Sequence, residues 1–128
     1  MAKARIPAAA GEQAIDAALA GQTARETVAT AVRYLLQLLD ERAPGNAVEV
    51  RVPPYGAVQV IEGPAHTRGT PPNVVEMDAA TWIAIGTGAL AWPDALRTGR
   101  ISASGLRADL SEHLPIRPAA TGRGRMEP

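Results

Sequence analysis

A long amphipathic helix is the clearest element that the hydrophobic pattern predicts. Apolar residues after Thr23 return at i, i+4, i+7, i+8 and i+11, and charged residues take the opposite side, a spacing typical of one buried helical face. The apolar positions are Val28, Val32, Leu35, Leu36 and Leu39. Thr23 and Glu26 have the spacing of a capping box, in which two side chains satisfy N–H groups at a helix start. We therefore expect a helix that begins at Thr23 and ends before Pro44, preceded by a shorter helix at residues 12–20.

Stretches of alternating apolar and polar residues predict three strands. In residues 47–52 every second residue is a valine and charged residues lie between them, which predicts one buried and one exposed face. The turn at residues 53–56 leads to a second strand at residues 57–62, so these strands form a hairpin. Residues 63–72 are rich in glycine and proline and predict a long ordered loop. A third strand is expected at residues 73–77.

Glycine and proline divide the next segment into two short helices. Asp78 is suited to cap a helix N-terminus, and Gly86 or Gly88 is suited to end that helix in the left-handed conformation. Pro93 marks the start of a second helix, because its missing N–H needs no partner there, and Gly99 ends it.

The last part of the chain predicts one more strand and one more helix. Residues 100–104 alternate polar and apolar side chains, the pattern of a half-buried strand. Leu106, Leu110 and Leu114 then recur at helical spacing until Pro115, which predicts a helix.

The order of these elements predicts the fold class. Two helices, three strands, two helices, a strand and a helix are typical of an α+β fold, with helices layered on one face of a mainly antiparallel sheet of about four to five strands. Residues 12–116 are expected to form a single domain. The flanking residues 1–11 and 117–128 are expected to be a flexible N-terminus and a disordered tail.

Composition narrows the classes of function. The 128 residues include 13 basic and 13 acidic ones, so the net charge is zero and does not favour binding to nucleic acid. The chain has no cysteine, which excludes disulfides and thiolate sites. No apolar run approaches the roughly 20 residues of a membrane-spanning helix, and the first residues lack the apolar stretch of a secretory signal. We expect a cytoplasmic protein without integral membrane contact.

Candidate chemistry is sparse. His66 and Arg68 share a segment in which a titratable ring and a planar guanidinium would suit an acidic head group, although both side chains are equally suited to order their own loop. His66 and His113 are the only histidines and lie far apart, so neither a metal site nor a cofactor is expected. Ser102 and Ser104 lack the G-x-S-x-G context, and no second catalytic group lies near His66 in sequence. We expect no catalytic activity.

Several motifs together resemble a known family. Residues 88–105 have the order glycine, alanine-rich helix, glycine, strand, glycine of the sterol carrier protein superfamily. Residues 50–59 (VRVPPYGAVQ), 66–76 (HTRGTPPNVVE) and 104–111 (SGLRADLS) look like a small bacterial sterol carrier-like family found in actinobacteria. The resemblance covers residues 12–116.

The resemblance implies a non-catalytic binding protein that holds a lipid-like or other apolar ligand between the sheet and the helices. The apolar lining expected from it is Val58, Val60, Trp82, Ile83, Leu96, Ile101 and Leu110. His66 and Arg68 would contact a polar head, and the helix expected after Gly105 would act as a lid. Ordinary core packing explains the same apolar residues without a ligand.

An alternative function is an interaction or dimerisation module with a filled core. Similar domains support a catalytic partner in larger proteins, and an exposed edge strand together with Trp92 would then form the contact surface, with such a partner or in a homodimer. The chain has no phenylalanine, whereas bulky aromatic side chains partly line the tunnels of the wider superfamily. This difference argues against a ligand as large as a sterol.

Overall fold

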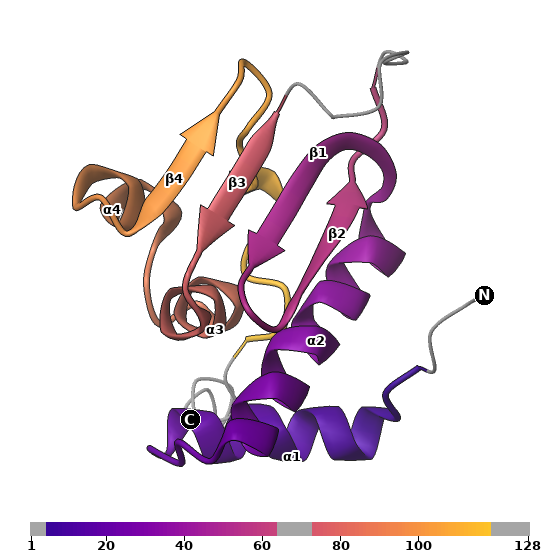
Figure 1. Ribbon diagram of the computed structural model, residues 1–128, viewed down its shortest axis with the longest axis vertical. Helices are drawn as coiled ribbons and strands as arrows, with labels where there is room; N and C mark the ends of the chain where they lie inside the picture. The colour runs from indigo at the N-terminus through magenta and orange to yellow at the C-terminus, as the bar shows by residue number, and fades with distance from the viewer. Residues whose placement is uncertain (1–4, 64–72, 119–128) are drawn as a thin grey trace, which may run out of the picture.

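A computed structural model describes residues 5–63 and 73–118 of the chain (Figure 1). The elements are α1 (Ala8–Leu19), α2 (Arg25–Arg42), β1 (Pro44–Val52), β2 (Gly56–Val60), β3 (Val74–Met77), α3 (Ala79–Thr87), α4 (Trp92–Arg97), β4 (Ile101–Ser104) and a 3₁₀ helix, η1 (Ser111–His113). The predicted α+β class is confirmed, and so is the predicted order of elements as far as β4.

The strands form one mixed sheet in the order β2–β1–β3–β4. β1 pairs antiparallel with β2, and β3 pairs antiparallel with β4, whereas β1 and β3 run parallel. The sheet is therefore mixed at its centre, where the sequence predicts a mainly antiparallel one. Alternation of valine with polar residues looks the same in either kind of pairing, so the pattern alone does not reveal a parallel pair.

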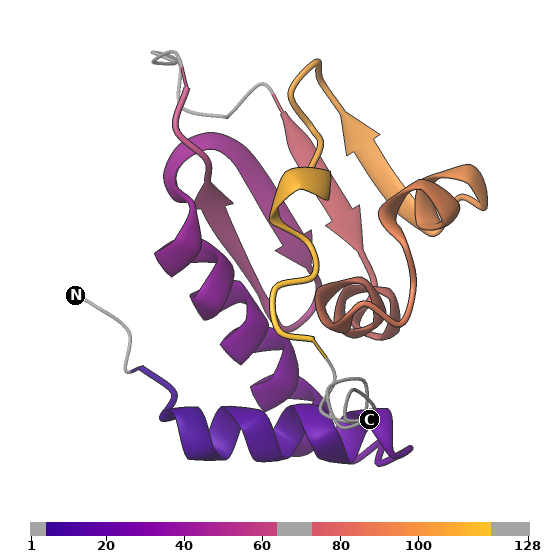
Figure 2. The ribbon, with the colours of Figure 1, turned by 180° about the vertical axis from the view of Figure 1, so that it is seen from behind.

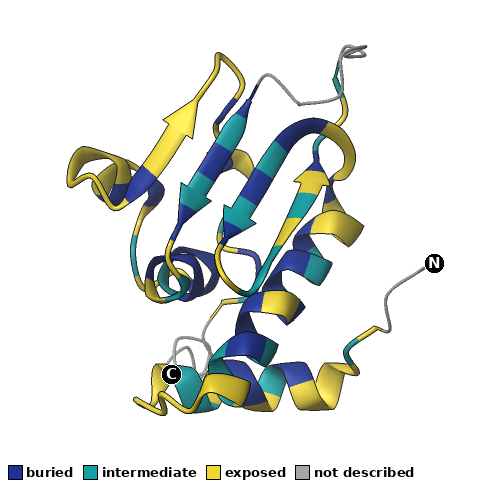
Figure 3. Ribbon diagram, viewed as in Figure 1, coloured by how far each residue is buried: buried dark blue, intermediate teal, exposed yellow. Residues whose placement is uncertain are grey.

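Buried and intermediate residues alternate along β1 and β3 (Figure 3), so one face of the sheet is buried and the other faces solvent. Val50 and Val75 pair across β1 and β3, and neither has any exposed surface. On the open face, Arg51 contacts Glu49 at 3.3 Å and Glu76 at 3.8 Å. The predicted alternation in β1 is confirmed, and it determines which face receives the helices.

α2, α3 and the C-terminal segment (residues 105–118) cover the buried face. Figure 2 shows the C-terminal segment crossing the sheet between α2 and α3, with α1 lying crosswise below them. Gly11 of α1 faces the ring of Tyr34 on α2, and a Cβ atom at Gly11 would lie 2.2 Å from the ring's Cγ. The missing side chain lets α1 approach α2 closely.

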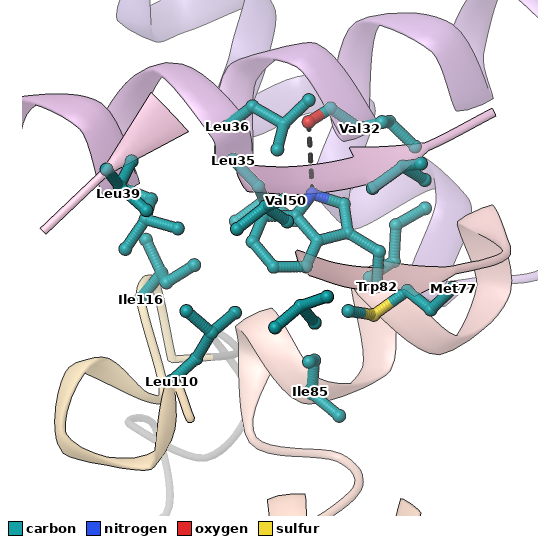
Figure 4. Packing of buried hydrophobic residues seen from close by; sticks show 14 of the residues in the cluster. Val32, Leu35, Leu36, Leu39, Val50, Met77, Trp82, Ile85, Leu110 and Ile116 are labelled. Atoms are coloured by element: carbon teal, nitrogen blue, oxygen red, sulfur yellow. Dashed lines mark hydrogen bonds between the residues drawn. The ribbon is translucent and has the colours of Figure 1, made fainter. Parts of the chain in front are cut away.

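Trp82 lies at the centre of the hydrophobic core (Figure 4). Its side chain has no exposed surface, and its indole N–H donates to the backbone oxygen of Val32 at 3.1 Å. That bond satisfies the single polar atom of a buried tryptophan side chain. The core residues around it include Leu35, Leu36 and Leu39 of α2, Val50 and Met77 of the sheet, Ile85 of α3, and Leu110 and Ile116 of the C-terminal segment.

The predicted ends of α3 and α4 are confirmed. The Asp78 carboxylate accepts a hydrogen bond from the Thr81 N–H at 2.8 Å, which caps α3. Gly88 ends α3 with a φ of 85°, the left-handed conformation that glycine adopts without strain. Pro93 lies in the first turn of α4, where its missing N–H leaves no helical bond unmade.

The predicted capping box of α2 is wrong. α2 begins at Arg25 with Ala24 as its N-cap residue, and no side chain caps it. Thr23 therefore lies one position before the N-cap, and Glu26 one position before the third helical residue. Both side chains are displaced by one residue from the places in which they would bind the helix N–H groups.

Two other boundaries differ from the prediction. α1 begins at Ala8, so four residues expected to be flexible are helical. β2 ends at Val60, because Ile61 has a φ of 68° and departs from the strand conformation.

The last predicted helix does not form, so the predicted helical lid is wrong. Leu106 is fully exposed, and helical structure is limited to the short η1. The segment makes local bonds that a helix does not make: the Asp109 N–H donates to the Arg107 oxygen at 2.8 Å, and the Ser111 N–H donates to the Asp109 carboxylate at 2.8 Å. In a helix, the Ser111 N–H would donate to the Arg107 oxygen, four residues before it. Asn73 holds the start of the segment beside β1, because its side-chain oxygen accepts from the Arg107 N–H at 2.9 Å and its amide donates to the Ala47 oxygen at 2.9 Å.

Polar contacts hold the C-terminal segment on the core. The Arg42 guanidinium donates to three of its backbone oxygens, those of His113, Pro115 and Ile116. The Gly86 oxygen accepts from the N–H groups of Ile116 and Arg117, at 2.8 and 2.9 Å. Ile116 is buried as a result, although the segment is mostly irregular.

Candidate functional site

Most of the residues predicted to line a cavity belong to the packed core. The core cluster contains Val60, Trp82, Ile83, Ile101 and Leu110. Leu96 differs from them, because it lies on α4 with 39% of its surface exposed. Val58 differs as well, because it is partly buried and lines the groove described below. The structure therefore brings five of the seven residues together beneath the helices and leaves Val58 beside open space.

Trp92 does not offer the contact surface that the interaction-module hypothesis assigned to it. It is only 6% exposed and packs in the core at the start of α4. The indole packs α4 against the core and is not exposed to a partner, so that part of the hypothesis is wrong.

A groove of about 810 Å³ lies between α2, β2 and the residues that precede α1. We call it the α2–β2 groove. Figure 1 shows α2 and β2 side by side, and within the described residues β2 pairs with β1 alone, so the groove follows an edge of the sheet. Its lining residues are Arg5, Ile6, Thr30, Arg33, Leu36, Gln37, Asp40, Tyr55, Gly56, Ala57 and Val58. Its volume falls in the range of small-molecule sites, about 300–1,000 Å³.

The apolar part of the groove is continuous with the core. Leu36 is 5% exposed and belongs to the core cluster, and Ile6 and Val58 are partly buried against that cluster. Gly56 keeps the space open, because a Cβ atom there would lie 3.3 Å from Leu36 Cδ1 and 3.9 Å from Arg33 Cγ. An apolar ligand in the groove would therefore contact side chains that the core already holds in place.

The segment before α1 forms one wall of the groove. The Gln37 side chain accepts from the Ile6 N–H at 2.9 Å and donates to the Ile6 oxygen at 3.1 Å. Arg5 forms an ion pair with Glu41, one turn further along α2. These contacts hold residues 5 and 6 alongside α2 and place the Ile6 side chain at the groove.

The polar rim of the groove includes one guanidinium fixed by the backbone. Arg33 Nε donates to the Tyr55 oxygen at 2.8 Å. Thr30 lies one turn before Arg33 on α2, and Asp40 lies two turns after it. The groove thus combines an apolar middle with a basic and an acidic group at different positions along α2.

No pattern in the sequence indicates that Arg33 and Gln37 line a groove. Arg33 and Gln37 occupy the polar side of an amphipathic helix, where side chains ordinarily face solvent. Their partners Tyr55 and Ile6 are 22 and 31 residues away, so no local pattern indicates the contacts.

His66 and Arg68 lie outside the described residues, and their role as a head-group contact stays a prediction. In residues 5–63 and 73–118, no group of three histidine, cysteine, aspartate or glutamate side chains is arranged to hold a metal ion. None of the helices in the same part of the chain has the length and apolar character that crossing a bilayer requires.

Comparison with protein families supports the resemblance found in the sequence. A family model described as "Bacterial SCP ortholog", where SCP stands for sterol carrier protein, matches residues 24–116. No curated protein matches the chain significantly. The matched region runs from the N-cap residue of α2 to Ile116, so it contains the sheet, α2, α3 and α4, while α1 and the Ile6 wall of the groove precede it. Because the match covers most of the chain, this protein belongs to the family of bacterial sterol carrier protein orthologues.

Proposed function

We propose that the protein is a cytoplasmic, non-catalytic carrier of a lipid-like or other apolar ligand, and that the α2–β2 groove holds the apolar part of that ligand. Membership of a family of sterol carrier protein orthologues supports a carrier role. The observation that carries the proposal is the groove of about 810 Å³ between the sheet edge and α2, with apolar side chains at its centre.

The groove offers a ligand chain a surface that is already ordered. Leu36, Ile6 and Val58 are held by the core or by Gln37, so little conformational entropy is lost when a ligand covers them. Each chain methylene removed from water contributes up to about 0.8 kcal/mol. A long chain is therefore needed for binding, because association itself costs at least about 4 kcal/mol and the groove stays open on one side.

Most of the other residues predicted as lining belong to the core and do not line the groove. Trp82, Val60 and Leu110 are fully buried in the core cluster that also contains Leu36, the floor of the groove, and we assign them to that core and not to direct ligand contact. We retain His66 and Arg68 as proposed contacts to a polar head.

The test is a binding experiment with neutral probes. Purified protein is titrated with 1-dodecanol and with cholesterol, and complexes are measured by calorimetry and by native mass spectrometry. Ala57→Trp places an indole in the groove and should abolish binding of 1-dodecanol, because Ala57 is an exposed lining residue of the edge strand β2.

The matched control is Ala103→Trp, which adds the same side chain at an exposed alanine of the opposite edge strand, β4. It should bind 1-dodecanol like the unmodified protein. Equal binding by both variants would remove the groove as the site, and no binding of either probe by the unmodified protein would remove the carrier function.

The interaction or dimerisation module is the second candidate function. The observation that favours it is the tight burial of Trp82 and its neighbours, because in this conformation those residues expose no surface to which a ligand could bind. The edge strand β4 is exposed at Ser102, Ala103 and Ser104 and would supply the contact. Concentration-dependent dimerisation of ligand-free protein, measured by analytical ultracentrifugation, would favour this function over carriage.

A further inference from the structure

We propose that Arg33 recognises an oxyanion, so that the ligand of the α2–β2 groove is a chain with a carboxylate or phosphate head. This inference rests on the proposed function and adds the chemistry of the head group. The residue is distinct from His66 and Arg68, which were assigned to a polar head from the sequence.

The position of Arg33 is determined by two contacts. Its aliphatic stem passes Gly56, where a Cβ atom would lie 3.9 Å from Arg33 Cγ, and its Nε donates to the Tyr55 oxygen at 2.8 Å. With Nε fixed, the plane of the guanidinium is fixed as well. The two Nη groups make no hydrogen bond to the described residues, so a pair of parallel donors remains at the rim of the groove.

The charge of Arg33 is not balanced by an ion pair within the described residues. Arg5, the other basic residue of the groove, pairs with Glu41, and Arg97 on α4 pairs with Asp94. Arg33 has only the neutral Tyr55 oxygen. A guanidinium with a neutral partner beside an apolar surface attracts an anion more strongly than one that is already paired.

The order of groups along α2 gives the ligand a direction. Thr30 lies one turn before Arg33, so its hydroxyl is placed to add a hydrogen bond to a head group held by the guanidinium. Leu36 follows Arg33 by one turn and is the first apolar contact for the chain. Asp40 is seven residues from Arg33, about 10 Å along the helix axis, so its carboxylate lies beyond Leu36 and not beside the head.

The experiment compares three probes that share one chain: dodecanoate, dodecyl phosphate and 1-dodecanol. Affinities are measured by calorimetry for the unmodified protein, Arg33→Gln, Arg33→Lys and Arg25→Gln. Arg25 is a matched control, because it lies on the same helix, is exposed and does not line the groove.

In the unmodified protein, at least one of the two anions should bind more tightly than the alcohol. Arg33→Gln should reduce the preference for that anion over 1-dodecanol by about tenfold to a hundredfold, the size expected for lost hydrogen bonds to a charged group. Arg33→Lys should keep part of the preference, and Arg25→Gln should keep all of it. The anion that binds more tightly identifies the head group as carboxylate or phosphate.

Two results would overturn the inference while the carrier function stands. Arg33→Gln would bind both anions with unchanged affinity, or it would lose as much affinity for the alcohol as for the anions. If none of the three probes binds the unmodified protein, the proposed function fails and this inference fails with it. Arg33→Gln loses the bond to Tyr55 and could fail to fold. In that case the affinities of the unmodified protein are measured at rising ionic strength. Added salt should lower the affinity for the anions and not for the alcohol, and an equal effect on both would reject the role of Arg33.

Discussion

At the scale of single residues, polar side chains that bind the main chain determine where segments begin and how they pack. Asp78 caps α3, Asn73 binds two distant backbone groups, Gln37 binds both backbone groups of Ile6, and Arg42 binds three oxygens of the C-terminal segment. Among the described residues, no buried side-chain nitrogen or oxygen lacks a partner. The loss of one of these side chains therefore leaves a specific backbone group unpaired.

Asp78 makes the stability of the protein depend on pH. Hydrogen bonds from Thr81 lower the pKa of Asp78 below its ordinary value of 3.8. A carboxyl group that binds its proton less tightly in the folded state stabilises that state above the unfolded pKa, and the stabilisation is lost as the pH falls through the lower folded pKa. Asp78→Ala should therefore reduce the free energy of unfolding by about 1 kcal/mol at pH 7, and the difference should become smaller in strong acid, where the wild type alone loses the part of the cap that depends on charge. Urea unfolding over a pH series measures it.

Asp78→Asn is the matched control for this effect. Asparagine keeps an oxygen that accepts from the Thr81 N–H, so most of the stability at neutral pH should remain, but it has no proton to gain. A difference between wild type and Asp78→Ala that stays constant down to strong acid would show that the charge of the cap is irrelevant.

At the scale of elements, the sequence predicts what a local pattern determines. The alternation of valines in β1, the Asp78 cap of α3 and the glycine at its end are all signals contained within a few residues, and each is confirmed. The resemblance in the sequence also predicts the family. The capping box of α2 is a local signal that fails by one residue, whereas the last helix fails in a segment held by distant residues. Asn73 binds the Arg107 N–H from 34 residues away, and Arg42 binds three oxygens of the same segment from more than 70 residues away. No local pattern shows these contacts, which hold the segment in an irregular path in place of the helix that three leucines suggested.

The groove is less predictable than the fold for the same reason. Gln37 and Ile6 are 31 residues apart, and Arg33 and Tyr55 are 22 residues apart, so the lining forms only when α2, the β1–β2 turn and the first described residues meet. Val58 is the member that the predicted lining and the groove have in common. The burial of Trp82, Ile83 and Leu110 follows from apolar character, but the same character suits a core and a cavity wall.

The leucines of the C-terminal segment provide a test of the observed packing against the predicted helix. Leu110 has no exposed surface, whereas Leu106 is fully exposed. Leu110→Ala should lower the free energy of unfolding by about 2–5 kcal/mol, because it leaves a cavity beside the core, and Leu106→Ala should change it by less than about 0.5 kcal/mol. Chemical denaturation of both variants measures the difference. Similar losses for the two would indicate a buried helical face at this segment and contradict the structure.

At the scale of the whole molecule, the C-terminal segment contacts the first helix, α1. Arg117, near the end of the C-terminal segment, forms ion pairs with Glu12 and Asp16 of α1. Burial by itself would lower the pKa of Arg117, but hydrogen bonds to Asp16 and Glu12 raise it above its ordinary value, so the guanidinium stays charged. α1 lies before the region matched to the family, and it is thus attached both to α2, through the Gly11–Tyr34 contact, and to the last residues of the domain.

Arg117→Gln tests whether this attachment holds α1 in place. The Arg117 side chain is only 12% exposed, but its partners are 41% and 54% exposed, so the carboxylates left behind remain solvated and the loss should be about 1 kcal/mol. A loss of that size, confined to α1, corresponds to amide exchange about fivefold faster in α1, with exchange in β1 and β3 unchanged. Hydrogen exchange followed by mass spectrometry measures both regions in one experiment.

Arg97→Gln is the control for this last prediction, because it removes an exposed arginine paired with Asp94 on α4, away from α1. It should leave exchange in α1 at the wild-type rate. If Arg117→Gln accelerates exchange equally in α1 and in the sheet, α1 opens only when the whole domain unfolds. The helix would then belong to the same cooperative unit as the region matched to the family, and the Ile6 wall of the α2–β2 groove would be as stable as its floor.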